Sequence, residues 1–198
     1  MSNVSRFTTL LASPFRSFFL LTGIYGVVTV LGWMSYLFGG IPLPLGLSPM
    51  HWHGHEMLFG LATAAIAGFL LTAMPNWTGA TPLKGAGLLA LIALWVAGRL
   101  VMWTASWWPS WCVALLDLLF LPVMAIYVGS VLLRYGNKKN LVMAGILIVL
   151  AFANVMMHWG FITGNIKWLM AGELLAFNVI TLMMVIIGGR IIPLFTAN

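Results

Sequence analysis

Residues 48–56 read Ser-Pro-Met-His-Trp-His-Gly-His-Glu and lead into an apolar stretch that we place at residues 50–74. A stretch of this length can cross the roughly 30 Å hydrocarbon core of a bilayer as a helix. Imidazole and carboxylate groups are costly to bury in hydrocarbon, so those found at the mouth of a span usually serve a site. The stretch therefore predicts a membrane helix with a site at one end.

The composition extends this interpretation to the whole chain. Of its 198 residues, 62% are hydrophobic and 6% are charged, whereas about a quarter of the residues in a soluble domain are charged. We therefore expect the lipid bilayer to surround the protein. The nine basic residues are scattered between apolar stretches and form no patch or stripe, which argues against a nucleic-acid-binding surface. The single cysteine, Cys112, excludes an internal disulfide and a cysteine-based zinc or iron–sulfur site within one chain.

Six apolar stretches are long enough to span a membrane. They lie near residues 17–38, 50–74, 85–104, 112–133, 141–163 and 168–189. We predict an all-α, polytopic membrane protein, a bundle of six transmembrane helices that forms one domain over residues 1–198. Turn-forming pairs such as Gly39-Gly40 and Gly164-Asn165 separate the stretches. Pro122 lies inside the fourth stretch and is expected to kink it.

The basic residues predict how these spans are oriented. If the spans alternate in direction, one side of the membrane receives seven of the basic residues and the other side only Lys167. The seven are Arg6, Arg16, Lys84, Arg134, Lys138, Lys139 and Arg190. The positive-inside bias then places both termini in the cytoplasm. Tryptophans crowd the opposite side, as in an interfacial belt; they are Trp103, Trp107, Trp108, Trp111, Trp159 and Trp168.

With this orientation, every acid, every histidine and one buried arginine fall in the outer half of the membrane, on five different spans. The set is His51, His53, His55, Glu56, Arg99, Asp117, His158 and Glu173. We predict that these residues form one polar site or two adjacent sites. Two simpler interpretations remain open: Arg99 and Asp117 as a buried ion pair between spans, and Glu173 as a hydrogen-bonded packing residue.

The helical geometry of the second span separates its histidines. Ser48 is a suitable N-cap and Pro49 a suitable first helical residue. His51 and His55 are four residues apart and share a face, whereas His53 lies about 200° around the helix from His51. Histidine is a common ligand of haem iron and copper, and the Glu56 carboxylate could orient a ligating imidazole. His51 sits at the helix mouth, where an interfacial polar role is the simpler interpretation.

Two stretches resemble signatures of the NnrS family. The first is Trp-His-Gly-His-Glu-Met-Leu-Phe-Gly at residues 52–60, which continues through residues 67–73 to Pro-Asn-Trp-Thr-Gly at 75–79. The second is Gly-Gly-Arg-Ile-Ile-Pro-Leu-Phe-Thr at residues 188–196. Between them, Ala97-Gly98-Arg99, Asp117 with Pro122, and Asn154 with His158 are also similar to family positions.

This resemblance implies a polytopic protein of the bacterial inner membrane that carries haem and copper. The family is associated with denitrification and with protection against nitric oxide and nitrosative stress, so nitric oxide or a similar small molecule is the implied ligand. His53, His55 and His158 match family histidines and are the implied ligands of haem or copper. The remaining polar candidates, Glu56, Arg99, Asp117 and Glu173, are expected to support them or to pair. Whether the protein is an enzyme stays open.

Family members are typically about twice this long, so we expect the chain to correspond to an N-terminal half, with a second half or a second copy as partner. Two rival functions remain. The chain could be half of a transporter or channel whose buried carboxylates and histidines relay protons or ions, or a structural subunit without a cofactor. A Soret band in the visible spectrum would favour the haem protein over both.

Overall fold

The computed structural model describes residues 8–40 and 46–196, which are helical apart from short connections. Arg6 and the connection after Gly40, residues 41–45, lie outside the described residues. Side chains are described up to Gly189 and then only for Ile192 and Thr196, so the Arg190 side chain in the second signature also lies outside them.

Six helical spans in the described residues are long and apolar enough to cross a membrane, which confirms the predicted fold class. Their helices are α2 (Pro14–Gly39), α3 (Pro49–His55) with η1 (Glu56–Ala62) and α4 (Thr63–Thr78), α5 (Ala86–Trp103), α6 (Ser110–Leu118) with α7 (Phe120–Arg134), α8 (Leu141–Thr163) and α9 (Ile166–Thr196). Short turns η2 (Ala105–Trp107) and η3 (Lys138–Asn140) join neighbouring spans. The single-domain organisation of residues 1–198 stays a prediction.

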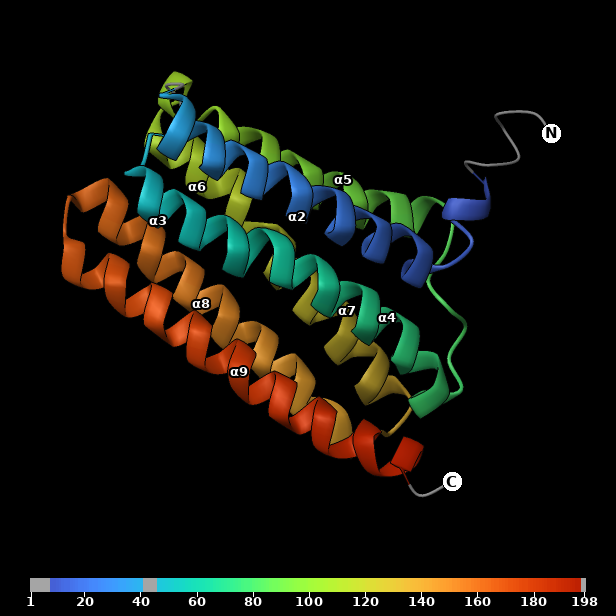
Figure 1. Cartoon of the computed structure of the whole chain (residues 1–198). Helices are drawn as coiled ribbons and strands as arrows, with labels where there is room; N and C mark the ends of the chain where they lie inside the picture. Colours follow the sequence, from blue (N-terminus) through green and yellow to red (C-terminus); the bar gives the residue numbers. More distant parts are fainter. Residues whose placement is uncertain (1–7, 41–45, 197–198) are drawn as a thin grey trace.

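Successive spans run in opposite directions along the bundle, so α2 begins and α9 ends at the same end (Figure 1). The second span, α3–η1–α4, is the most enclosed: 56% of its most apolar window is buried, against 22% for α2 and for α9. Helices α8 and α9 lie side by side along their length (Figure 1). The histidine-rich second span therefore faces protein, while α2 and α9 turn much of their surface outward.

The fourth span is interrupted at Leu119, between α6 and α7. Pro122 lies one turn further on and explains the interruption, because proline has no N–H to donate to the Leu118 carbonyl and its ring crowds that carbonyl. The sequence predicts a kink at this proline, and the structure has a one-residue interruption of the helix three residues before it. Asp117 consequently lies in the last turn of α6, just before the interruption.

The second span changes from α-helix to π-helix directly after His55, over Glu56–Ala62. Such wide turns occur frequently at functional sites. Gly60, within this segment, accepts a hydrogen bond from the Trp95 indole at 3.1 Å. A Cβ atom on Gly60 would lie 2.7 Å from the Tyr25 ring and 2.8 Å from the Arg99 guanidinium. The glycine therefore leaves room for two polar side chains beside Glu56.

Candidate metal centre

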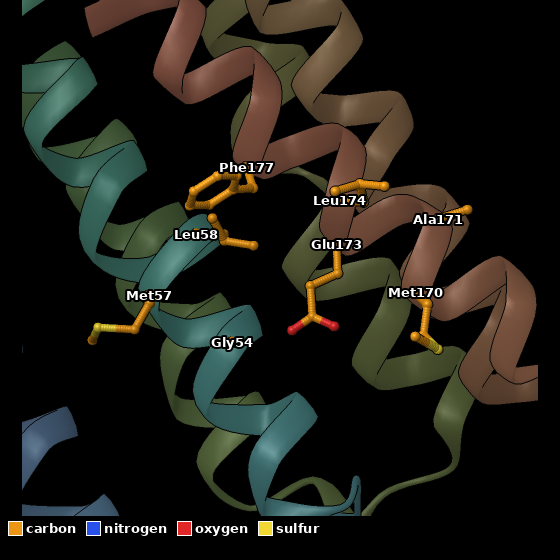
Figure 2. A pocket seen from close by; sticks show the side chains of 8 residues that line it. All are labelled: Gly54, Met57, Leu58, Met170, Ala171, Glu173, Leu174 and Phe177. Carbon is orange, nitrogen blue, oxygen red and sulfur yellow. The ribbon is translucent and has the colours of Figure 1, made fainter.

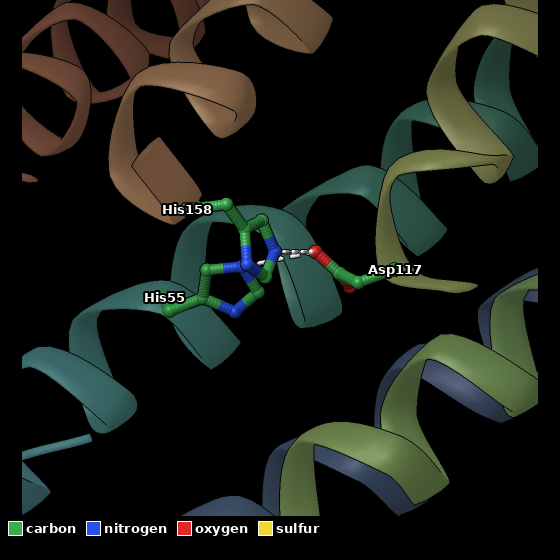
Figure 3. Close-up of side chains that lie close together, drawn as sticks. All are labelled: His55, Asp117 and His158. Atoms are coloured by element: carbon green, nitrogen blue, oxygen red, sulfur yellow. Dashed lines mark hydrogen bonds and ion pairs between the residues drawn. The ribbon is translucent and has the colours of Figure 1, made fainter. Parts of the chain in front are cut away.

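His55, Asp117 and His158 meet inside the bundle, one each from α3, α6 and α8 (Figure 3). Asp117 Oδ2 lies 2.8 Å from His158 Nε2 and 3.1 Å from His55 Nε2. One nitrogen or oxygen atom from each side chain lies within 4.8 Å of the other two. The three residues are only 1%, 3% and 4% exposed, respectively. Two imidazoles and one carboxylate from three spans thus converge on one enclosed point.

Asn154 joins the three groups from α8, one turn before His158. Its amide nitrogen donates to Asp117 Oδ2 at 2.8 Å, and its amide oxygen lies 3.0 Å from His55 Nε2. The Asn154 and Asp117 oxygens both accept, so His55 Nε2 must carry the hydrogen in this arrangement. Asn154 therefore fixes both the carboxylate and the imidazole.

Arg99 connects the two buried carboxylates. Its Nη1 donates to Glu56 Oε1 at 2.9 Å and to Glu56 Oε2 at 3.0 Å, and its Nη2 donates to Asp117 Oδ1. Glu56 Oε1 also lies 2.9 Å from His55 Nδ1. The expected pairing of Arg99 with Asp117 is present, and Glu56 lies where a carboxylate can orient an imidazole.

Sequence reasoning gave no site role to Asn154 and missed Tyr25 altogether. Its hydroxyl donates to Glu56 Oε2 and accepts a hydrogen bond from Trp103 Nε1 at 2.9 Å. The Trp95 ring meets the Tyr25 ring edge-on at 5.1 Å. The available signal was a tyrosine hydroxyl in the middle of the apolar first span, because a buried Tyr O–H usually finds a hydrogen-bond partner.

With both carboxylates ionised, the charges of the enclosed network do not balance. Glu56 and Asp117 contribute two negative charges and Arg99 one positive charge, and Arg99 is the only Lys or Arg paired with these carboxylates in the described part of the chain. Both ring nitrogens of His55 face oxygen acceptors. Burying an uncompensated charge is costly. The site therefore holds one further proton, on Glu56 or on His55, or a metal ion in its place.

The other sequence candidates lie apart from this point. His51 Nδ1 pairs with Glu173 Oε2 at 3.1 Å, and the two side chains are 14% and 28% exposed. His53 stacks on Trp33 at 4.7 Å, and its buried Nδ1 has no hydrogen-bond partner among the described residues. His53 thus points away from His55, as its helical position predicts, and its ligand role stays a prediction.

The donor set suits a single metal ion. Imidazole nitrogen binds copper, zinc, iron and nickel, and a carboxylate oxygen can complete such a site. Haem fits His55 and His158 poorly, because a porphyrin ring needs open space directly beyond the nitrogen of the imidazole that binds its iron. Both imidazoles are enclosed by protein, and Asp117 and Asn154 occupy the space beside their Nε2 atoms. The arrangement supports an ion at this point and gives no support to haem there.

The fold and the site together define a polytopic α-helical membrane protein with a buried histidine–aspartate–histidine group that could hold a metal. Comparison with known families makes this class specific. The NnrS protein family matches residues 9–198, so the chain belongs to the NnrS family, and the sequence resemblance is confirmed. No curated protein and no solved structure matches the chain.

Proposed function

We propose that this NnrS-family chain binds a copper ion through His55, Asp117 and His158 and serves nitric oxide metabolism and protection against nitrosative stress in the bacterial inner membrane. One observation carries the proposal: metal-binding groups from three spans converge at one buried point beside two carboxylates that share a single arginine. A metal cation can take the place of the proton that otherwise balances the second carboxylate. Copper is the ion that the family resemblance implies and that imidazole ligands suit.

The residues around the trio have separate tasks in this proposal. When an ion replaces the hydrogen on His55 Nε2, the hydrogen moves to Nδ1 and Glu56 accepts it, which leaves Nε2 as the ligating nitrogen. Asn154 holds the Asp117 oxygen that both histidines share. Arg99 keeps the two carboxylates together by neutralising one charge. Copper, when bound, supplies one-electron redox chemistry in a site that these residues close to water.

Metal analysis of purified protein tests the proposal. The chain is expressed with copper in the medium, purified in detergent, and analysed for copper per chain by mass spectrometry. We expect stoichiometric copper in the wild type, and its loss in His55→Ala and His158→Ala. His51→Ala is the matched control, since His51 lies on the same helix but outside the trio.

Full copper content in both trio variants would overturn the assignment. Size-exclusion profiles check that each variant keeps its fold, and His158→Gln replaces His158→Ala if the alanine variant aggregates. The visible spectrum of the same samples tests haem separately. A Soret band that survives both histidine substitutions would place haem away from the trio, as the enclosure of the two imidazoles requires.

A further inference from the structure

The Asn154 side chain lies at the same enclosed point as the trio of His55, Asp117 and His158, and it is 2% exposed. Asn154 precedes His158 by four residues on α8, so the two side chains project from one face of that helix. Its amide nitrogen lies 2.8 Å from Asp117 Oδ2, and its amide oxygen lies 3.0 Å from His55 Nε2. Asn154 thus contacts two members of the trio and lies one helical turn from the third.

The neighbours of Asn154 decide which way its amide group faces. An ionised carboxylate only accepts hydrogen bonds, so the amide nitrogen, which donates, must face Asp117. The amide oxygen then faces His55 Nε2. This orientation directs an oxygen with free lone pairs toward the place where the imidazole nitrogens and the carboxylate meet.

The hydrogen on His55 Nε2 marks the place that a metal ion can take, because a ligating imidazole nitrogen must lose its proton. Two acceptors share this hydrogen: Asp117 Oδ2 at 3.1 Å and Asn154 Oδ1 at 3.0 Å. Both oxygens already direct a lone pair toward a positive hydrogen, so an ion that replaces the hydrogen meets the same two oxygens. His158 Nε2, 2.8 Å from Asp117 Oδ2, adds the second nitrogen.

Two hollows adjoin the second span. One, of about 560 Å³, lies between the second and sixth spans, and Glu173 and Phe177 belong to its α9 wall (Figure 2). The other, of about 210 Å³, is lined by His51 and Gly160 among others. Neither Asn154 nor any member of the trio lines either hollow. A small molecule held in these hollows would not touch the trio, whereas the Asn154 oxygen already does.

We propose that Asn154 Oδ1 is the fourth ligand of the copper ion, in a set of two imidazole nitrogens and two oxygens. The inference rests on the proposed function and extends it. Mixed nitrogen and oxygen ligands are typical of Cu²⁺ sites. Metal sites that bind a small molecule keep one position open, whereas four protein ligands close the site. The ion held here can therefore exchange electrons, but it binds no small molecule until a ligand leaves.

Pulsed electron paramagnetic resonance on the Cu²⁺-loaded protein tests this inference through the amide nitrogen of Asn154. An asparagine auxotroph supplies protein in which only the asparagine nitrogens are nitrogen-15. A copper ion bound through the amide oxygen couples to the nitrogen attached to the same carbon. We expect a nitrogen-15 coupling in the wild type and its loss in Asn154→Ala. Asn178→Ala is the control, because Asn178 is an exposed residue of α9 whose amide bonds the Leu174 carbonyl.

Two further measurements separate ligation from a purely structural role of Asn154. Asn154→Asp offers an oxygen in the same place, so it should keep copper and the two imidazole couplings while losing the nitrogen-15 coupling. Azide, added to the copper-loaded protein, tests whether the fourth position is filled. It should leave the visible spectrum of the wild type unchanged and should produce a charge-transfer band in Asn154→Ala, where the position is open.

Two results would overturn the inference: a wild type that shows the two imidazole couplings without the nitrogen-15 coupling, or the same response to azide in the wild type and in Asn154→Ala. The copper assignment would survive either result, with Asn154 serving only to hold Asp117 and His55. Failure of the copper assignment itself looks different, because the imidazole couplings would then be missing as well, and the inference would fall with it.

Discussion

Asp117 and His158, on different spans and 41 residues apart in the chain, are joined by a 2.8 Å hydrogen bond between Oδ2 and Nε2. The same Asp117 oxygen also meets His55 Nε2 at 3.1 Å. Two imidazoles that share one carboxylate oxygen form a compact group of donors. A cation placed among them would contact all three side chains.

Replacing Arg99 by methionine should lower the stability of the fold by about 3 to 5 kcal/mol, because breaking a buried ion pair leaves uncompensated charges. Here two carboxylates, Glu56 and Asp117, would lose their guanidinium. Thermal unfolding in detergent measures the change. Arg134→Met, at the exposed end of α7, is the control and should change stability little. Equal unfolding temperatures for both variants would contradict the central role of Arg99.

Replacing Glu56 by glutamine should weaken copper binding about 10- to 100-fold, as expected when the carboxylate that orients a ligating histidine is lost. Glu56 Oε1 lies 2.9 Å from His55 Nδ1. Competition titration with a copper chelator measures the affinity. Glu173→Gln removes a carboxylate that contacts His51 instead and should leave copper affinity unchanged. Equal effects of the two substitutions would argue against a specific role for Glu56.

Gly160→Ala should disrupt the packing of α8 against α9. A Cβ atom at Gly160 would collide with the backbone nitrogen of Leu169 and lie 2.8 Å from its Cα atom, and backbone atoms cannot move aside as a flexible side chain can. Overpacking of this kind costs about 1 to 3 kcal/mol. At Gly145, on the same helix, a new Cβ meets nothing within 4 Å. Gly145→Ala should therefore be neutral or stabilising in the same unfolding assay, and a loss of stability there equal to that of Gly160→Ala would contradict this explanation.

Single cysteines introduced into a Cys112→Ser background test the proposed orientation. Trp108 lies before α6 at the tryptophan-rich end, and Lys139 lies in η3 at the opposite end of the bundle. A membrane-impermeant maleimide added to intact cells should label Trp108→Cys and leave Lys139→Cys unlabelled. The reverse pattern would show that the positive-inside interpretation is wrong and would put the His51–Glu173 pair near the cytoplasm.

Much of this arrangement could be predicted from the sequence. Hydropathy locates the spans. Once the direction of each span is known, His55, Arg99, Asp117 and His158 fall at the same depth in the membrane, and this shared depth predicts that they lie near one another. The depth of a residue in the membrane does not say, however, which way its side chain points around the helix axis. That direction depends on how the spans pack, so the pairing of His51 with Glu173 could not be foreseen.

The second span shows a further limit. The regular spacing of a helix correctly predicts that His53 and His55 point in different directions. No residue pattern predicts the π-helix that begins at Glu56. Tyr25 and Arg99, from two other spans, occupy the space over Gly60 within this wide turn. Contacts between such distant parts of the chain are not visible in a local sequence pattern.

The most direct test of the central claim is pulsed electron paramagnetic resonance on the purified protein loaded with Cu²⁺. We expect the wild-type spectrum to contain couplings from the remote nitrogens of two imidazoles. His55→Ala and His158→Ala should each retain the coupling from one imidazole. His51→Ala and His53→Ala should retain the couplings from both. A wild-type spectrum without imidazole nitrogen couplings, or couplings that persist unchanged in His55→Ala and His158→Ala, would contradict the assignment of His55, Asp117 and His158 as the copper site.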